Sequence, residues 1–263
     1  MGELRSSGLS GLALTGTSIG NIVKWNKVQN GVTYFIKASS LEGKTFTNRE
    51  PISEYVASIM GHQMNLDIVE TFYREITVSA TSQYREQDCI ISYTADFIKE
   101  DEIFIPFVKL VKIDKFSYDS PLWWISRFKE DINKMLIFDF IIGNYDRHLN
   151  NFGVVLKKDK SEVKFSTIFD NGSSLLANYS DLDLKEMSPK DVDRDMLAKP
   201  FKSNHFEQIE LVKELPKGLN LDIDLNIVKS AIDEFSLDIS SYRRKRILNL
   251  VERRLHFVKE KFK

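Results

Sequence analysis

The segment DFIIGNYDRHLNN at residues 139–151, together with FDNG at residues 169–172, decides the fold of this chain. Asp146 and Asn151 have the Asp-x-x-x-x-Asn spacing of a catalytic loop, in which the carboxylate accepts a hydroxyl proton and the amide oxygen binds magnesium. Asp170 is then expected to be the second magnesium ligand. The pattern therefore predicts a phosphoryl-transfer centre with Asp146 as its base.

The composition is that of an ordinary globular protein. Of the 263 residues, 42% are hydrophobic and 29% are charged, which excludes disordered and fibrous classes. A formal net charge of -1 does not support nucleic acid as a partner. Cys89 is the single cysteine, so an internal disulfide and a cysteine-rich metal site are excluded.

The sequence also bears on location. No apolar run approaches the roughly 18 residues that a membrane span needs, and the first residues, MGELRSS, lack the apolar core of a signal peptide. A single free thiol fits a reducing compartment. We therefore expect no membrane span and a cytoplasmic location.

Glycine, serine and threonine are frequent in residues 12–21, LALTGTSIGN, near the N-terminus. Gly16 and Gly20 permit close approach of backbone N–H groups to phosphates, although two such glycines also occur in ordinary turns. A phosphate-covering loop would bind nucleotide through consecutive residues, which are Gly16, Thr17, Ser18, Ile19 and Gly20.

Lys37 stands at the end of a predicted hairpin, with strands at residues 22–25 and 32–38 and a turn at residues 29–31. From there its side chain could reach nucleotide phosphates or simply lie in solvent. Residues 51–62 are predicted as a helix with an apolar stripe. Glu54 in this helix could pair with Lys37 or be an exposed first-turn glutamate.

Further strands are predicted at residues 68–73, 77–80 and 89–93, which complete a strand-rich N-terminal lobe over residues 1–97. The run from Ser92 to Phe97 would connect this lobe to the next, and the backbone near Tyr93 could meet an adenine edge. Residues 98–263 form the second, mostly helical lobe.

Within the second lobe, helices are predicted over most of residues 98–145, a hairpin at 152–156 and 163–169, and helices at 211–215, 227–235 and the C-terminus. Asp139 interrupts an apolar helix face, so it should accept hydrogen bonds from the loop backbone around Asn144 to Asn151. The C-terminal helix carries a basic cluster, for which a solvated face is the default interpretation; its members are Arg243, Arg244, Lys245, Arg246, Arg253 and Arg254.

The order of these motifs resembles the HipA-like serine/threonine kinases. The matching elements are the glycine-containing loop, strand Lys37, helix Glu54 in SEYVA, the segment GNYDRHLNN and the segment FDNGSSL. The likeness is to the compact CtkA-type branch and covers roughly residues 14–180. The chain lacks VAIK, APE and the His-Arg-Asp order, so it departs from ordinary eukaryotic protein kinases.

The resemblance implies an α+β, two-lobed protein-kinase-like fold and an ATP- and magnesium-dependent protein kinase that phosphorylates serine or threonine. Asp146 would be the base, Lys37 would bind phosphates with Glu54 as its partner, and Asn151 and Asp170 would bind magnesium. It also implies a bacterial cytoplasmic location, with secretion into a host left open, and a toxin or effector role with an antitoxin or inhibitor partner.

Family loops carry a regulatory autophosphorylated serine, for which Ser18 is the candidate and Thr15 and Thr17 are competitors. A phosphate there would repel the phosphates of ATP. Two alternatives stay open. The Asp-Arg-His core also occurs in phosphoinositide kinases, so the acceptor could be a lipid or small molecule, and a nucleotide-binding pseudokinase is the third interpretation.

Overall fold

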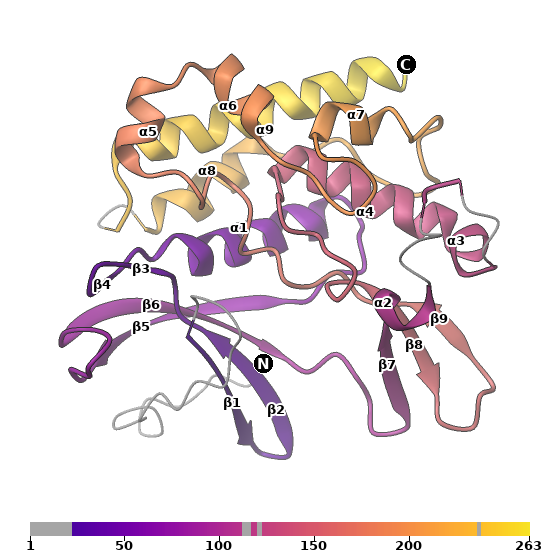
Figure 1. Ribbon diagram of the computed structural model, residues 1–263, viewed down its shortest axis with the longest axis horizontal. Helices are drawn as coiled ribbons and strands as arrows, with labels where there is room; N and C mark the ends of the chain where they lie inside the picture. The colour runs from indigo at the N-terminus through magenta and orange to yellow at the C-terminus, as the bar shows by residue number, and fades with distance from the viewer. Residues whose placement is uncertain (1–22, 112–116, 120–122, 236–237) are drawn as a thin grey trace.

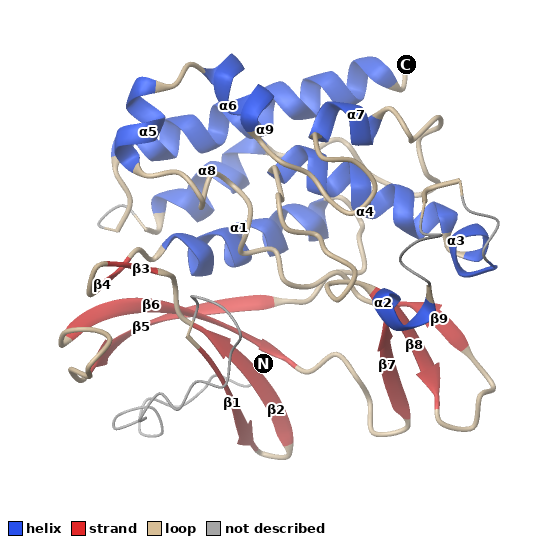
Figure 2. Cartoon of the chain, viewed as in Figure 1, coloured by secondary structure: helices blue, strands red, loops and turns tan. Residues whose placement is uncertain are grey.

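The computed structural model describes residues 23–111, 117–119, 123–235 and 238–263 and has two layers of different character (Figure 1). Strands gather at one side and helices at the other (Figure 2). The N-terminal sheet has the order β1-β2-β6-β5 and consists of β1 (Lys24–Gln29), β2 (Val32–Lys37), β6 (Gln87–Ala95) and β5 (Thr71–Val78). A short ribbon, β3 (Leu41–Glu42) with β4 (Thr45–Phe46), leads into helix α1 (Arg49–Gln63).

The hairpin of β1 and β2 confirms the strand prediction around residues 29–31. Asn30 and Gly31 have φ values of 52° and 77°, which a two-residue hairpin turn of the I′ type requires. Because such a turn joins directly paired strands, β1 continues to Gln29, beyond the predicted end at residue 25. The register places Lys24 opposite Lys37.

Strand β5 corrects one detail of the prediction. Residues 68–73 and 77–80 were predicted as separate strands, but Thr71–Val78 is continuous because its central residues pair with β6. The polar pair Arg74 and Glu75 interrupts the hydrophobic pattern without interrupting this ladder, since backbone pairing does not depend on side-chain hydropathy.

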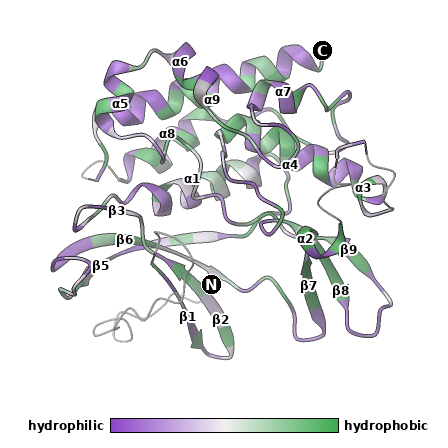
Figure 3. Cartoon of the chain, viewed as in Figure 1, coloured by the Kyte–Doolittle hydropathy of each residue, from purple (hydrophilic) through white to green (hydrophobic). Residues whose placement is uncertain are grey.

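The second lobe is built around α4 (Lys129–Ile142), whose residues from Met135 to Ile142 are all buried. This helix is hydrophobic over most of its circumference, as expected of a helix enclosed by other elements (Figure 3). Other helices surround or extend this core, namely α2 (Phe107–Leu110), α3 (Trp123–Arg127), α5 (Asp181–Glu186), α6 (Pro189–Asp195), α7 (His205–Ile209), α8 (Leu225–Asp233) and α9 (Ser241–Lys261).

A second sheet, β7-β8-β9, lies beside α2 (Figure 1). Its outer hairpin, β8 (Gly153–Lys157) and β9 (Val163–Phe165), was predicted, but β7 (Glu102–Pro106) was not, because the region was assigned mostly to helices. The β7 strand forms by pairing with β8, some fifty residues away along the chain. A Cβ atom on Gly153 would lie 2.2 Å from the carbonyl oxygen of Ile105, so only glycine permits this approach.

Two predictions for the C-terminal region are wrong. Residues 211–215 are not helical; the helix in this region is α7, which starts earlier because the Asn204 side chain caps it by accepting from the Phe206 N–H. The basic cluster is not a uniformly solvated face, since Arg243, Arg246 and Arg254 are buried.

The buried arginines tie α9 to the rest of the lobe. Arg254 donates to the carbonyl oxygen of Phe140 at 2.6 Å and pairs with Asp193 at 3.3 Å. Arg243 donates to Asp181 at 2.6 Å and to backbone carbonyls of the segment before α5. Each guanidinium therefore replaces water at several acceptors, which is the condition for burying its charge.

The structure confirms the predicted α+β, two-lobed protein-kinase-like fold. The boundary at residue 97 stays a prediction. Helix α1 packs against α8, and its buried residues belong to the same hydrophobic core as α4 and α9. The sheet has a smaller core of its own, around Ile36, Ile91 and Tyr93. Across the described ranges, no helix is both long enough and apolar enough to cross a membrane.

We predict that Arg254→Met lowers the free energy of unfolding by about 2 kcal/mol or more, because it leaves the buried Phe140 carbonyl without its donor. Lys245→Met on the exposed side of α9 is the matched control and should change stability by less than about 0.5 kcal/mol. Urea unfolding of both variants measures the difference, and equal stabilities would show that Arg254 is not a structural tie.

Candidate active site

The segment between α4 and β8 is held by a buried ion pair. Arg147 and Asp139 are both fully buried, and the guanidinium contacts both carboxylate oxygens, with Nη2 2.9 Å from Oδ1 and Nε 3.0 Å from Oδ2. Asn144 adds a hydrogen bond from its side chain to Asp139 at 3.1 Å. Asp139 therefore supports this loop, as predicted, but its carboxylate accepts from the side chains of Asn144 and Arg147 and not from the loop backbone.

The other side of the Arg147 guanidinium reaches the segment that contains Asp170. Nη1 donates to the carbonyl oxygen of Phe169 at 2.5 Å, and Nη2 donates to Oδ1 of Asn171 at 2.6 Å. Nη1 also lies 3.4 Å from the carbonyl oxygen of Asn151. One side chain thus brings together the two segments that the sequence analysis assigned to a single site.

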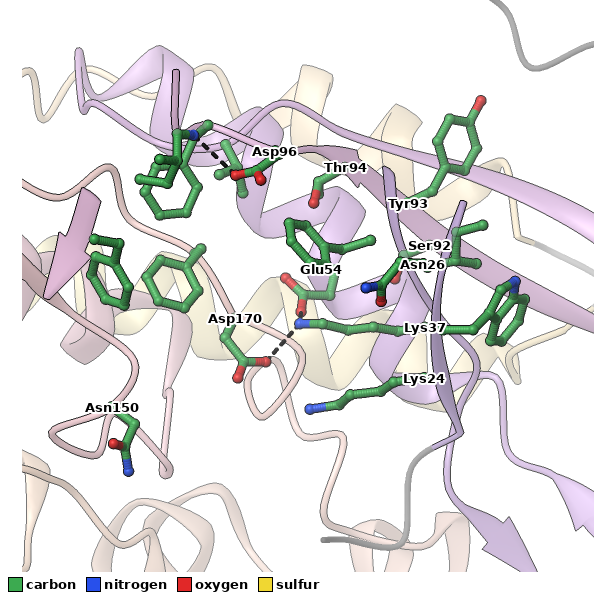
Figure 4. A pocket seen from close by; sticks show the side chains of 18 residues that line it. Lys24, Asn26, Lys37, Glu54, Ser92, Tyr93, Thr94, Asp96, Asn150 and Asp170 are labelled. Atoms are coloured by element: carbon green, nitrogen blue, oxygen red, sulfur yellow. Dashed lines mark hydrogen bonds and ion pairs between the residues drawn. The ribbon is translucent and has the colours of Figure 1, made fainter. Parts of the chain in front are cut away.

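Lys37 bridges two carboxylates from different parts of the chain (Figure 4). Its Nζ lies 2.5 Å from Oε1 of Glu54 on α1 and 2.7 Å from Oδ1 of Asp170. The second oxygen of Glu54 accepts the backbone N–H of Asn171 at 2.9 Å. The expected pairing of Glu54 with Lys37 is therefore present, and Glu54 is a buried partner and not an exposed first-turn residue.

The charges in this bridge stabilise one another. Burial acts against the Lys37 ammonium, but Asp170 and Glu54 outweigh it and raise the pKa of Lys37 above its ordinary value. Burial likewise acts against ionised Asp170, but Lys37 and Lys24 outweigh it and hold the pKa of that carboxyl well below its ordinary value. Lys37 and Asp170 are thus both charged at neutral pH.

A cavity of about 580 Å³ opens beside this bridge. Its polar end contains Lys24, Lys37, Glu54 and Asp170. Its apolar end includes an aromatic wall in which the Phe169 ring lies 5.3 Å from that of Phe97 and 5.5 Å from that of Phe104. The volume and the separation of apolar from charged walls suit a ligand with a flat base and an anionic tail.

Asp146 lies in the loop between α4 and β8, and 36% of its side chain is exposed to solvent. Its Oδ1 accepts from Nζ of Lys199 at 2.7 Å, while Nε2 of His148 lies 4.0 Å from Oδ2. The backbone of Asp146 is fixed at both ends. The Asp146 N–H donates to Oδ1 of Asn144 at 3.1 Å, and the Asp146 carbonyl oxygen accepts from Nδ2 of Asn151 at 3.1 Å.

The other predicted site residues divide into two groups. Gly16, Thr17, Ser18, Ile19 and Gly20, with Thr15, lie outside the described residues. Tyr93 lines the cavity, but its ring points away from Lys37 and Asp170 (Figure 4), and its backbone pairs with Ile36 of β2 and Phe72 of β5 in the sheet. Asn150, which precedes Asn151 in the chain, is exposed and also lines the cavity.

Several residues of the site were missed by the sequence analysis. The side chain of Lys24 runs beside that of Lys37 toward Asp170 (Figure 4), and only the hairpin register could have indicated this. The aromatic wall was missed because its members lie far apart in the chain. Lys199 carries no local signal, since it follows Asp146 by 53 residues.

The donor atoms near Asp170 fit magnesium. Asp170 offers a partly exposed carboxylate, and the Asn151 amide donates through Nδ2 to Asp146, which leaves its oxygen as the possible ligand. Among the described residues no group of three or more His, Cys, Asp or Glu side chains could hold a metal. Magnesium does not need such a group, because it often binds one or two protein oxygens together with substrate phosphates and water.

Comparisons with known proteins identify a family and a shared fold. The family model described as phosphatidylinositol 3- and 4-kinase matches residues 26–216. The Helicobacter pylori proinflammatory kinase CtkA superposes with a TM-score of 0.67 at 19% identity, over 95% of this chain and 92% of that one. This likeness confirms the expected CtkA-type fold.

A second solved structure is HipA of Shewanella oneidensis MR-1, from a toxin–antitoxin complex with HipB and operator DNA. It gives a TM-score of 0.46 at 15% identity, over 93% of this chain and 66% of that one. The comparison with curated protein sequences gave no match.

We predict that Lys37→Met lowers the melting temperature at pH 7, since it leaves Glu54 and Asp170 close together without their shared cation. The pKa of Asp170 is lowered in the folded chain, so stabilisation through it is present above about pH 4 and is lost as the pH falls further. The melting-temperature gap between wild type and variant should therefore narrow at about pH 3.

Thermal unfolding at both pH values measures this gap. Lys44→Met, which removes an exposed lysine near the same sheet, is the control and should show no gap at either pH. A gap of constant size for Lys37→Met would contradict the assignment of the stabilisation to the carboxylates.

Proposed function

We propose that this chain, which belongs to the phosphatidylinositol 3- and 4-kinase family, transfers the γ-phosphoryl group of ATP to a serine or threonine hydroxyl of a protein, in a magnesium-dependent reaction. The observation that carries the proposal is the bridge from Lys37 to Glu54 and Asp170 beside the loop that bears Asp146. It joins a phosphate-binding cation, a magnesium-ligand candidate and a base candidate in one site.

The donor side of the reaction uses the cavity. The adenine ring would occupy the apolar end against Phe97, Phe104 and Phe169, and the phosphates would lie at the end that contains Lys37. Glu54 keeps the Lys37 ammonium in place and is itself held by the Asn171 N–H, so the cation is positioned before ATP binds.

The acceptor side uses Asp146, which is exposed enough to meet a macromolecular substrate. Its carboxylate accepts the hydrogen bond of the substrate hydroxyl and orients the hydroxyl oxygen toward the γ-phosphorus. Asp170 and Asn151 would hold magnesium, which would supply positive charge at the phosphates. Lys37 adds a second positive charge from the N-terminal sheet.

Protein as the acceptor is supported by the order of motifs from Lys37 to the FDNG segment, which resembles that of the HipA-like serine/threonine kinases, and by the fold shared with the kinase CtkA. The name of the matching family points to a lipid acceptor instead. A toxin role and an antitoxin partner stay predictions from the motif resemblance.

We predict that the purified chain incorporates label from γ-³²P-ATP and magnesium into itself or into dephosphorylated casein, and that Asp146→Asn reduces the rate by roughly a hundredfold or more. The measurement is label retained in protein after gel separation. Vesicles containing phosphatidylinositol form a parallel arm, with label measured in extracted lipid.

The arms separate the three interpretations. Label in lipid and none in protein would replace the protein acceptor by a lipid one. Binding of ATP with no label in either acceptor would make the chain a pseudokinase. Undiminished transfer by Asp146→Asn would remove Asp146 from the role of base.

Autophosphorylation in the glycine-containing loop is a further part of the proposal. Ser18 is the expected site, and a phosphate there would repel ATP. Mass spectrometry after incubation with ATP should find the phosphate on Ser18, and Ser18→Ala should remove it and prolong activity. Phosphate confined to positions outside residues 15–18 would contradict this regulation.

A further inference from the structure

Lys199 forms an ion pair with Asp146, the base candidate, and the backbone that carries Lys199 is fixed by a buried contact. The ion pair with Asp146 by itself carries little weight, because 48% of the lysine side chain is exposed and surface pairs contribute little to stability. The backbone beneath Lys199, in contrast, is held by a buried side chain.

That side chain is Gln208 on α7, which is 1% exposed. Its Nε2 donates to the carbonyl oxygen of Lys199 at 2.7 Å, and its Oε1 accepts the N–H groups of Phe201 at 3.0 Å and Lys202 at 3.3 Å. A buried amide that uses both ends on one loop fixes the conformation of that loop. The Cα atom of Lys199 is therefore held in place although its ammonium is exposed.

Helix α4 supports both partners of the ion pair. Helix α7 packs on α4, where the rings of Phe206 and Phe140 lie 5.2 Å apart. Helix α4 also carries Asp139, which holds Arg147 next to Asp146 in the chain. Lys199 and Asp146 are thus anchored to one rigid element from two sides, and their contact follows from the fold and not from chance on a flexible surface.

The contact distinguishes the two oxygens of the Asp146 carboxylate. Oδ1 is occupied by the Lys199 ammonium at 2.7 Å, whereas the neighbour of Oδ2 is His148 at 4.0 Å, beyond hydrogen-bonding distance. Among the residues that the structure describes, none hydrogen-bonds to Oδ2, so Oδ2 is the oxygen open to a substrate hydroxyl.

We propose that Lys199 is a positioning residue for the base. Its ammonium holds Oδ1 of Asp146 and so presents Oδ2 to the acceptor hydroxyl. In the transfer, the hydroxyl oxygen forms a bond to the γ-phosphorus, the bond from phosphorus to the bridging oxygen of ADP breaks, and the hydroxyl proton passes to Oδ2. The inference rests on the proposed function, whose site it extends to the loop between α6 and α7.

The test compares Lys199→Met, Lys199→Arg and Lys202→Met. Lys202→Met is the matched control, because that lysine is an exposed neighbour on the same loop whose backbone is also held by Gln208. Each variant is assayed for kcat and for KM of ATP with casein as acceptor, and for melting temperature. If the wild type labels phosphatidylinositol instead, the same variants are assayed on that lipid.

Lys199→Met should lower kcat by roughly ten- to a hundredfold, with the KM of ATP and the melting temperature unchanged, because only the orientation of the base is lost. Lys199→Arg should recover most of the rate, and Lys202→Met should match the wild type. The fall in kcat without a fall in melting temperature separates positioning from a structural role.

Two results overturn the inference while leaving the proposed function intact. The first is an active wild type with an unchanged kcat in Lys199→Met. The second is a loss of rate accompanied by a lower melting temperature that Lys199→Arg does not restore. A wild type that transfers no phosphoryl group to protein or lipid overturns the proposed function, and the inference fails with it.

Discussion

The contact between Arg147 and Asp139 is the constraint on which the site depends. Both side chains are fully buried, so the pair costs several kcal/mol of desolvation per ion, and it is stable only because the guanidinium meets both carboxylate oxygens and further acceptors at Phe169, Asn151 and Asn171. Through those extra acceptors, Arg147 also fixes the segments of the site relative to one another. One guanidinium fixes the end of α4, the loop that carries Asp146 and the segment that carries Asp170, and the Tyr145 N–H adds a bond to the carbonyl oxygen of Ser173 at 3.0 Å. Arg147, which follows the base candidate in the sequence, is therefore the residue that holds these segments together.

The network continues from this pair into the N-terminal sheet. Asn171, which accepts from Arg147 through its side chain, donates its backbone N–H to Glu54, and Glu54 in turn binds Lys37. Helix α1 is also tied to the segment that follows Asn171, since the Ser53 hydroxyl donates to the carbonyl oxygen of Ser174 at 3.0 Å. At the other end of the helix, Asn220 donates to the carbonyl of Gln63 at 2.8 Å. Since both ends of α1 are held by the second lobe, the fold itself directs Glu54 at Lys37 and no ligand is needed to bring the two together.

The parts of this site that the sequence could predict are those set by short spacing or by one strong local rule. Asp146 with Asn151, the Asn30–Gly31 turn and the support of the loop by Asp139 depend on contacts within a few residues, and the two-lobed fold followed from the order of such motifs. Strand β7 and the burial of Arg243 and Arg254 depend on partners far along the chain, and a basic run has the same local pattern whether its face meets water or carbonyl oxygens. Lys24 and Lys199 were missed for the same reason, since neither differs locally from any other lysine.

The exposed fraction of the charged side chains increases from the Lys37 bridge to the loop that carries Asp146. Glu54 is 3% exposed, Lys37 23% and Asp170 29%, whereas Asp146 is 36% and Lys199 48% exposed. The groups assigned to ATP are therefore held in a region of low dielectric, where fixed charges act strongly and need no rearrangement. The groups assigned to the acceptor lie where water competes, so their orientation has to come from the backbone beneath them, through Arg147 on one side and Gln208 on the other. In the proposed reaction, recognition of the nucleotide would thus be built into the core, while recognition of the acceptor would be left to the surface around Asp146, where sequence changes cost the fold little.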